Sequence, residues 1–298
     1  MGKNKRWGKK YKDKRDWPTY NEKLVNRGEY YINPKFLQTW NPEIKEMNNN
    51  KVGNPYLYPE SLIEFLAILK EKGFKDRDLE GILRGLSKNM NNFPVISYSQ
   101  INRRINALDI QFSNEYDNKL IVGIDGTGHK VTNRGDWMRH VWKVKRGWIK
   151  IVIMGTIDGK IVDVRVGTEK YDERNAGRIM IKKHKDKIKK VLADGLHDCN
   201  ETFDLCEKLG IDTAIKIREN ASKKGLGRRP REVRKYKKKG YKKWAKEKKY
   251  GMRWPATEGI FSAEKRIFGE CITATKKANM YKQAKRKFWA YNKLIQNC

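Results

Sequence analysis

The sequence predicts an α/β protein in which a mixed five-stranded sheet with flanking helices follows an all-helical region. Two patterns lead to this prediction: apolar residues at helical spacing before residue 110, and short apolar runs alternating with helical segments after residue 119. A third observation is charge, because 68 Lys and Arg against 35 Asp and Glu leave a formal net charge of +33. This excess indicates a polyanionic partner, nucleic acid first of all.

The length of 298 residues is sufficient for one large domain and a smaller accessory region. We expect a basic arm with short helices over residues 1–55, a helical region over 56–115 and a larger α/β domain over 116–298. No apolar run is long enough to span a bilayer, and none follows the basic N-terminus as a signal peptide requires. The expectation is a soluble, cytoplasmic protein associated with the nucleoid.

The N-terminal segment is strongly basic. Residues 1–16 contain eight Lys or Arg without hydrophobic periodicity, which indicates a flexible arm that becomes ordered on a polyanion. Residues 17–55 mix aromatic residues with four prolines, which favours short helices and turns over strands.

Three helices are expected between Pro59 and Leu108. Pro59 suits the first turn of the first helix and Gly73 its end, and the second helix follows directly. Ser97 or Ser99 can cap the third. Its apolar face is Ile101, Ile105 and Leu108, which leaves Arg103 and Arg104 facing outward. A helix-turn-helix module and an ordinary helical bundle with solvated arginines explain this stretch equally well.

Residues 119–217 have the element order βββαβαβα, which is that of a ribonuclease H-like fold. The first three strands are the apolar runs 120–124, 149–154 and 161–166, with the turn signal Asp158-Gly159 between the last two. A helix over 174–190 leads into a fourth strand that ends at Ala193, a second helix ends near Gly210, and 213–217 is the fifth strand.

Two aspartates lie at the ends of neighbouring strands in this fold. Asp125 closes the first strand and Asp194 the fourth, so both side chains can meet at one edge of the sheet. Converging carboxylates suit two-metal phosphodiester chemistry, because hard divalent cations take oxygen ligands. The alternative for either aspartate alone is a turn former before glycine.

A third carboxylate would come from the last helical region, where Glu258, Glu264 and Glu270 compete. Glu264 lies near the centre of an apolar face, whereas Glu258 shares another line with Lys265, seven residues later. A carboxylate near a lysine suits a phosphate site, but an acid within an apolar stripe also invites a functional explanation. Periodicity alone leaves the choice open.

Residues 223–249 hold 15 Lys or Arg and two Glu, and resemble a basic insertion at about 220–250. We favour a segment that contacts phosphates over a merely solvated face. Trp137, Trp142 and Trp148 could stack on an unpaired base, although packing on a hairpin is the better explanation. Cys199 and Cys206 with His197 fit no common zinc spacing, and helix packing accounts for the cysteines.

The motifs around these residues resemble those of DDE transposases of bacterial and archaeal insertion sequences, of the insertion-sequence-five type. The segment 124–128, Ile-Asp-Gly-Thr-Gly, is similar to the first catalytic aspartate motif, and 193–198, Ala-Asp-Gly-Leu-His-Asp, to the second. Glu258, with Lys265 after it, resembles the glutamate motif, in which a Tyr, an Arg, the catalytic Glu and a Lys occur in series. The similarity covers most of the chain.

The resemblance implies that Asp125, Asp194 and Glu258 are catalytic and bind two Mg²⁺ ions, for which Mn²⁺ can substitute. Tyr250 and Asp198 are expected to support the site. The basic residues assigned to DNA are Arg103, Arg104, Arg228, Arg229, Arg231, Lys237, Arg253 and Lys265.

Three positions depart from the family pattern. Four residues separate Arg253 from Glu258 where the family has three. Glu264 stands in place of an apolar residue, and His197 in place of a tyrosine. None of these changes removes a member of the triad.

The implied reaction is in-line attack on phosphorus, first by water to free a 3′-hydroxyl at the transposon end and then by that hydroxyl on target DNA. The expected partners are terminal repeats and target DNA, bound by a homodimer or larger assembly. The alternatives are a ribonuclease H-like nuclease that does not join strands, and a basic nucleic-acid-binding protein without activity.

Overall fold

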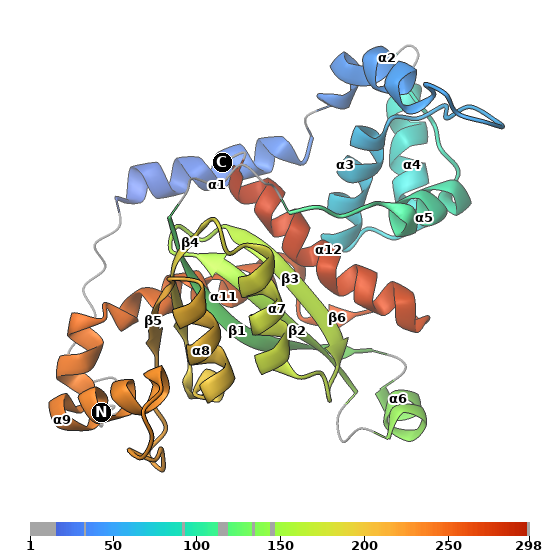
Figure 1. Cartoon of the computed structure of the whole chain (residues 1–298). Coiled ribbons are helices and arrows are strands. Elements are labelled where there is room, and N and C mark those ends of the chain that lie inside the picture. Colours follow the sequence, from blue (N-terminus) through green and yellow to red (C-terminus); the bar gives the residue numbers. More distant parts are fainter. Residues whose placement is uncertain are drawn as a thin grey trace, which may run out of the picture.

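The computed structural model describes residues 16–32, 34–90, 93–112, 119–132, 135–143 and 147–296. The predicted basic arm, apart from Asp16, lies outside the described residues. Figure 1 shows a twisted mixed sheet with helices on both faces and a cluster of N-terminal helices beside one end of α12 (Lys277–Gln296). The predicted α/β class, with a helical region before the sheet, is confirmed.

The N-terminal region is helical, as the sequence indicates. Its elements are α1 (Trp17–Tyr30), α2 (Phe36–Met47), α3 (Glu60–Glu71), α4 (Asp76–Ser87) and α5 (Tyr98–Ala107). Pro59 is the N-cap residue of α3, and Gly73, with a φ of +120°, follows the end of that helix. The conformation of Gly73 is one that other residues rarely adopt, which explains the stop.

The third predicted helix, α5, has the expected buried face of Ile101 and Ile105. Arg103 is exposed, as predicted. The expectation that Arg104 faces outward is wrong: its side chain is half-buried, donates to the carbonyl of Tyr58 at 3.2 Å and lies 4.9 Å from the ring centre of Tyr56. A long amphipathic side chain can cover neighbouring backbone and aromatic surface in this way.

The sheet has the strand order β3-β2-β1-β4-β5. These strands are β1 (Leu120–Val131), β2 (Trp148–Thr156), β3 (Ile161–Thr168), β4 (Ile188–Ala193) and β5 (Asp212–Ile215). The first three are antiparallel, whereas β4 and β5 run parallel to β1. The sequence did not predict β6 (Cys271–Ile272), which pairs with the end of β1.

The prediction that β1 ends at Asp125 is wrong, and the reason lies in its two neighbours. Antiparallel pairing with β2 continues to Lys130, but parallel pairing with β4 stops at the pair Ile124 and Ala193. Asp125 is therefore the first residue at which the β4 side of β1 is open. Pairing with β6 begins only at Lys130.

Other predicted boundaries are also wrong. The helix expected over 174–190 is the shorter α7 (Glu173–Lys183), and β4 begins already at Ile188, which pairs with Leu120 of β1. The two lysines after Ile188 interrupt the apolar pattern, so the sequence does not indicate a strand there. Pairing with β1 extends β4 over these lysines. Of the three tryptophans expected on a hairpin, Trp137 and Trp142 lie instead in α6 (Gly135–Trp142), whereas Trp148 begins β2, which pairs antiparallel with β1.

Most of the predicted basic insertion forms a helix, α9 (Arg228–Glu247). It buries Val233 and Trp244 and breaks at Gly240, where φ is +73°. After it come α10 (Arg253–Ala256), α11 (Glu258–Phe268) and α12.

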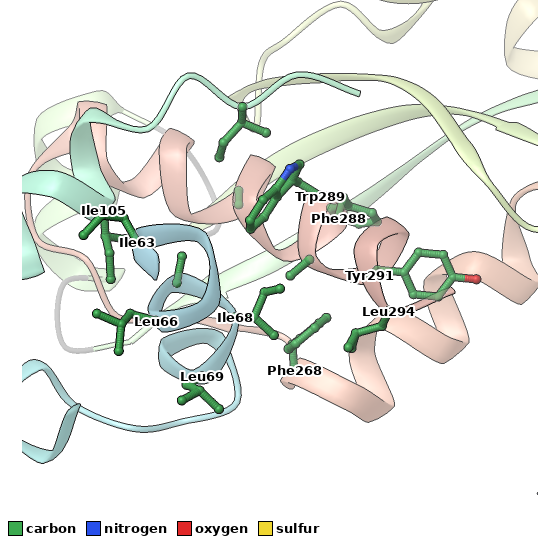
Figure 2. Close-up of a cluster of buried hydrophobic side chains, with 14 of the residues drawn as sticks. Ile63, Leu66, Ile68, Leu69, Ile105, Phe268, Phe288, Trp289, Tyr291 and Leu294 are labelled. Carbon is green, nitrogen blue, oxygen red and sulfur yellow. The ribbon is translucent and has the colours of Figure 1, made fainter. Parts of the chain in front are cut away.

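The two largest hydrophobic clusters lie on opposite faces of the sheet, each beneath the helices that cover that face in Figure 1. One lies under α7 and α8 (Asn200–Lys208), and Cys206 packs within it. The other joins the N-terminal helices to α11, α12 and the sheet in one continuous cluster, shown in Figure 2. Phe288, Trp289 and Tyr291 of α12 are buried there. In the part of the chain described, no helix is long and apolar enough to cross a membrane.

Candidate active site

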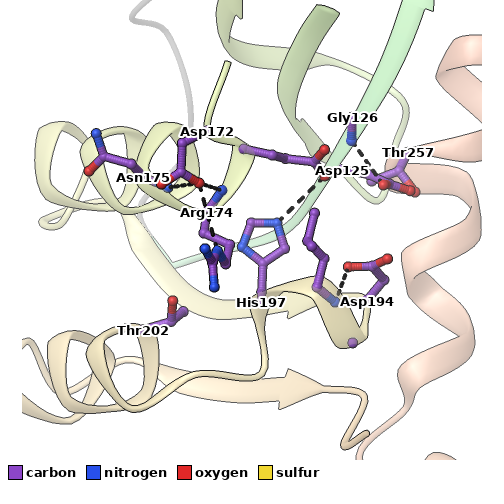
Figure 3. A network of polar contacts seen from close by, with 12 residues as sticks. Asp125, Gly126, Asp172, Arg174, Asn175, Asp194, His197, Thr202 and Thr257 are labelled. Atoms are coloured by element: carbon purple, nitrogen blue, oxygen red, sulfur yellow. Dashed lines mark hydrogen bonds and ion pairs between the residues drawn. The ribbon is translucent and has the colours of Figure 1, made fainter. Parts of the chain in front are cut away.

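Asp125 and Asp194 lie side by side on neighbouring strands. Because Ile124 pairs with Ala193, the two aspartates that follow occupy equivalent positions on β1 and after β4. Their carboxylates accept local backbone N–H groups: Asp125 from Gly126 at 2.9 Å, and Asp194 from Leu196 at 2.8 Å (Figure 3). The sheet thus brings the two predicted aspartates together.

Glu258 reaches the same place because α10 and α11 meet directly against the sheet. A Cβ atom at Gly123 of β1 would lie only 2.8 Å from side-chain atoms of both Ala256 and Thr257, and one at Gly155 of β2 would overlap the backbone of Ala256. Glycine at both positions lets the helix junction approach this closely. Glu258, the first residue of α11, is half-exposed at the edge of the site.

Arg253 connects two of these acids. Its Nη1 donates to Asp125 Oδ2 at 2.6 Å, and its Nη2 lies 3.7 Å from Glu258 Oε1. Its guanidinium also lies 5.8 Å from the ring centre of Tyr250, which is buried. The extra residue between Arg253 and Glu258 therefore does not remove the arginine from the site.

The two competing glutamates lie elsewhere. Glu264 is fully buried, as its position on an apolar face predicts, and its Oε1 lies 3.2 Å from His129 Nε2. Glu270 pairs with Lys265 at 3.3 Å on the surface. Neither of these glutamates, nor Lys265, contacts the paired aspartates.

The sequence analysis missed a fourth carboxylate, Glu173, at the start of α7. Its carboxylate packs against Gly126, where an added Cβ atom would overlap it. His197 Nε2 lies 3.9 Å from Glu173 Oε1. An acid in the first turn of a helix is usually a response to the helix dipole, which is why this residue carries no functional signal in the sequence. The sequence feature that reflects this contact is Gly126, directly after Asp125, because a larger residue there would overlap the carboxylate of Glu173.

Burial controls the protonation of these groups. It raises the pKa of Asp125, an effect that Arg253 opposes and Asp194 and Glu258 reinforce. Burial, with Asp125 and Asp194 nearby, raises the pKa of Glu173 to about 7. Burial also lowers the pKa of His197 to about 4, so its imidazole is neutral at pH 7.

Most of the basic residues assigned to DNA in α9 have internal partners. Arg229 donates two hydrogen bonds to the buried carboxylate of Asp198, at 2.6 and 3.1 Å. Arg228 and Lys237 donate to backbone carbonyls, and Arg231 pairs with Glu207. The exposed cations of this helix that remain are lysines, among them Lys238, Lys242, Lys243 and Lys246. Asp198 therefore anchors α9 beside the turn that follows β4.

A cavity of about 850 Å³ adjoins Asp194. It is lined by three cations and three tyrosines, which the sequence analysis did not group together: Lys216, Arg218, Arg253, Tyr236, Tyr241 and Tyr250. Arg218 also donates to the carbonyls of Gly195 and Leu196 and so fixes the turn after Asp194.

The donor set fits a divalent cation, although the side chains do not yet converge as ligands. Among the described residues, no three His, Cys, Asp or Glu side chains are close enough to hold a metal ion. The cationic guanidinium of Arg253 lies between Asp125 and Glu258 instead. Carboxylate oxygens are among the ligands that Mg²⁺ and Mn²⁺ prefer.

Comparison with known proteins gives two matching families, both described as "Transposase DDE domain". The first covers residues 25–134 and the second residues 117–292. Among solved structures, the chain is similar to a cryo-EM structure of a piggyBac transposase synaptic complex with hairpin DNA. That similarity has a TM-score of 0.39 and 11% sequence identity, and covers 92% of this chain and 74% of the other.

Proposed function

The chain belongs to the transposase DDE domain family, and we propose that it binds transposon ends and catalyses metal-dependent cleavage and strand transfer with Asp125, Asp194 and Glu258. The observation that carries this proposal is the position of Asp125 where β1 loses its β4 neighbour, beside Asp194 and joined to Glu258 by Arg253. Like charges placed this near one another need a cation beside them, which is Arg253 in the protein alone and, in this proposal, also a bound metal ion.

Two Mg²⁺ ions, when bound, would activate the attacking oxygen and stabilise the leaving oxygen. In this proposal the carboxylates of Asp125, Asp194 and Glu258 would hold the ions, with Asp125 next to both other acids. Arg253 neutralises Asp125 in the protein alone and turns to the phosphate when DNA is bound. Tyr250 supports the guanidinium through its ring face.

DNA binding is assigned to two exposed basic surfaces. On α5, Arg103 lines a hollow of about 520 Å³ together with Lys75 and Arg77, which suits recognition of a transposon end. On α9, the exposed lysines suit sequence-independent phosphate contacts. Binding of two ends by two copies is the corresponding assembly.

Cleavage of a labelled duplex that carries the repeats flanking the gene, followed by capture of a target plasmid, tests this function. Glu258→Gln keeps size and hydrogen bonding but removes the charge that holds a cation, so cleavage should fall by about 100-fold or more while end binding persists. Glu264→Gln is the matched control, because it retains a hydrogen bond to His129 and should leave cleavage largely intact.

The outcomes separate the alternatives. An inactive Glu264→Gln beside an active Glu258→Gln would overturn the assignment of the third carboxylate. Cleavage without joined product would indicate a nuclease. Binding with no metal-dependent cleavage in the unmodified protein would indicate a DNA-binding protein without activity.

A further inference from the structure

Glu173 occupies an unusual place for a helix-terminal acid. The N-cap residue of α7, Asp172, already accepts the N–H groups of Arg174 and Asn175, at 3.0 and 3.3 Å. The helix end is therefore capped without Glu173, whose side chain turns inward and is only 11% exposed. Capping of the helix does not explain its burial.

The chain leaves room for this carboxylate beside Asp125. Gly126 follows Asp125 on β1, and any side chain there would overlap the carboxylate of Glu173. Glu173, Asp125 and Asp194 lie close enough together that each aspartate raises the pKa of Glu173. Glu173 and Arg253 thus approach Asp125 separately: Glu173 lies against the adjacent Gly126, and Arg253 bridges Asp125 to Glu258.

Glu173 has no close cationic partner. Within the described part of the chain, no Lys or Arg lies within ion-pair distance of Glu173 or Asp194. Lys150 shares a hollow of about 270 Å³ with Glu173 and lowers its pKa, but by less than burial and Asp125 raise it. A buried anion without an ion-pair partner is costly, and two more carboxylates nearby increase the cost. Either a proton on Glu173 or a bound cation removes that cost.

A second, independent feature points into the same place. His197 is 1% exposed, and its Nε2 has no hydrogen-bond partner among the described residues. Gly177 of α7 makes room for the ring, because a Cβ atom there would lie 2.8 Å from His197 Cε1. Figure 3 shows the His197 ring near Asp125 and Asp194, and the dashed line from the ring marks the 3.9 Å contact between His197 Nε2 and Glu173 Oε1.

We propose that Glu173 is a fourth carboxylate ligand for the divalent cation held by Asp125 and Asp194, and that His197 is its positioning residue. This inference rests on the proposed function. Mg²⁺ takes up to six oxygen ligands, so a further carboxylate adds to the set without displacing one. Carboxylates that bind a metal ion are in turn held by hydrogen bonds from neighbouring groups, and His197, 3.9 Å away, is placed to supply one to Glu173.

Binding of Mn²⁺ to the full-length protein without DNA, followed by electron paramagnetic resonance, tests the proposal directly. Asp125→Asn and Glu173→Gln should each weaken Mn²⁺ binding by roughly tenfold or more, as removal of a ligand or its support does. Glu201→Gln is the matched control, since this exposed glutamate lies near the start of α8 and should leave Mn²⁺ affinity unchanged.

Thermal melting distinguishes a metal ligand from a merely structural acid. In EDTA, Glu173→Gln should melt at the same temperature as the unmodified protein or higher, because a buried repulsive charge is gone. Its stabilisation by Mg²⁺ should be reduced. A lower melting temperature in EDTA with an unchanged Mg²⁺ response would overturn the proposal.

His197 is tested by a double-mutant cycle. His197→Phe should weaken Mn²⁺ binding in the unmodified protein but have no further effect in the Glu173→Gln background, which a general structural role would not produce. If Asp125→Asn lowers Mn²⁺ affinity and Glu173→Gln does not, this inference fails and the proposed function stands. If neither change affects Mn²⁺ binding, the proposed function itself fails.

Discussion

At the scale of single residues, the site is defined by which carboxylates have a partner. Asp125 and Glu258 share Arg253, Glu264 has His129, and Glu173 has, among the described side chains, only a neutral histidine. Like charges held this close are stabilised by a cation, whether a guanidinium or a metal ion. The proposed metal binding therefore implies competition between Arg253 and a divalent cation.

Replacing Arg253 by alanine tests that competition. Without DNA, Arg253→Ala should raise Mn²⁺ affinity roughly tenfold, because an opposite charge near a carboxylate alters its affinity for cations by at least that much. Cleavage should nevertheless fall, because the guanidinium no longer binds the phosphate. Arg266→Ala, which changes an exposed arginine on α11, is the control for net charge. Equal Mn²⁺ affinity in all three proteins would contradict the expected competition.

Glu173 and His197 also predict an unusual dependence of stability on pH. The pKa of Glu173 rises from 4.5 to about 7 on folding, so this group makes the folded protein less stable as pH rises through that window. The pKa of His197 falls from 6.5 to about 4, so this group makes it less stable as pH falls from 6.5 towards 4. Between pH 4.5 and 6.5 the two effects oppose each other.

Single variants should separate the two effects. In EDTA, Glu173→Gln should lose stability on acidification from about pH 6.5 to 4.5 more steeply than the unmodified protein, and His197→Phe should lose stability as pH rises from about 4.5 to 7. Denaturant unfolding at several pH values measures both slopes. Parallel curves for all three proteins would show that neither group titrates as its burial requires.

At the scale of elements, glycine residues and strand register position the candidate catalytic carboxylates. Gly123 and Gly155 let the junction of α10 and α11 lie on the sheet, and the end of β1–β4 pairing exposes Asp125. The basic helix α9 has two separate roles. Its arginines anchor it to the turn after β4 and to neighbouring backbone, and its exposed lysines face solvent.

This division predicts different effects of charge removal in α9. Neutralising Lys238, Lys242, Lys243 and Lys246 to Gln should flatten the plot of log affinity for DNA against log salt by about 0.9 for each phosphate that is no longer neutralised. Folding should be unchanged. Arg229→Ala should instead destabilise the protein, because the buried carboxylate of Asp198 loses its partner. An unchanged salt dependence in the lysine variant would contradict the assignment of α9 to phosphate binding.

At the scale of the whole molecule, the N-terminal helices and the catalytic sheet share one hydrophobic cluster (Figure 2). A buried ion pair spans it: Arg286 Nε of α12 donates to Glu71 Oε1 of α3 at 2.6 Å, and both side chains are at most 3% exposed. The other oxygen of Glu71 and Nη1 of Arg286 have no hydrogen-bond partner among the described residues. The pair therefore fixes orientation more than it adds stability.

Arg286→Leu should lower the free energy of unfolding by about 3–5 kcal/mol, because it leaves a buried carboxylate unpaired. Adding Glu71→Leu should restore much of this loss, since an apolar pair avoids the cost of desolvation. Denaturant unfolding of both variants measures the difference. A double variant no more stable than Arg286→Leu would show that the charge of Glu71 is compensated elsewhere.

The sequence by itself determined the α/β class, the helical N-terminal region and the candidate carboxylates on β1 and after β4. These follow from local periodicity, turn residues and charge, which are properties of neighbouring residues along the chain. Asp125 and Asp194 were identifiable because each follows an apolar run. The match of Glu258 to the third position depended on family resemblance, since Glu264 fitted the helical period as well.

Only the tertiary structure decided where the strands end and which acids meet. β1 continues past Asp125 because β2 still pairs with it, and β4 starts at Ile188 because β1 is its neighbour. Long-range pairing overrides local propensity in such segments. Glu173 and Arg229 have no signal along the chain, because their partners Gly126 and Asp198 are distant in sequence and become neighbours only on folding.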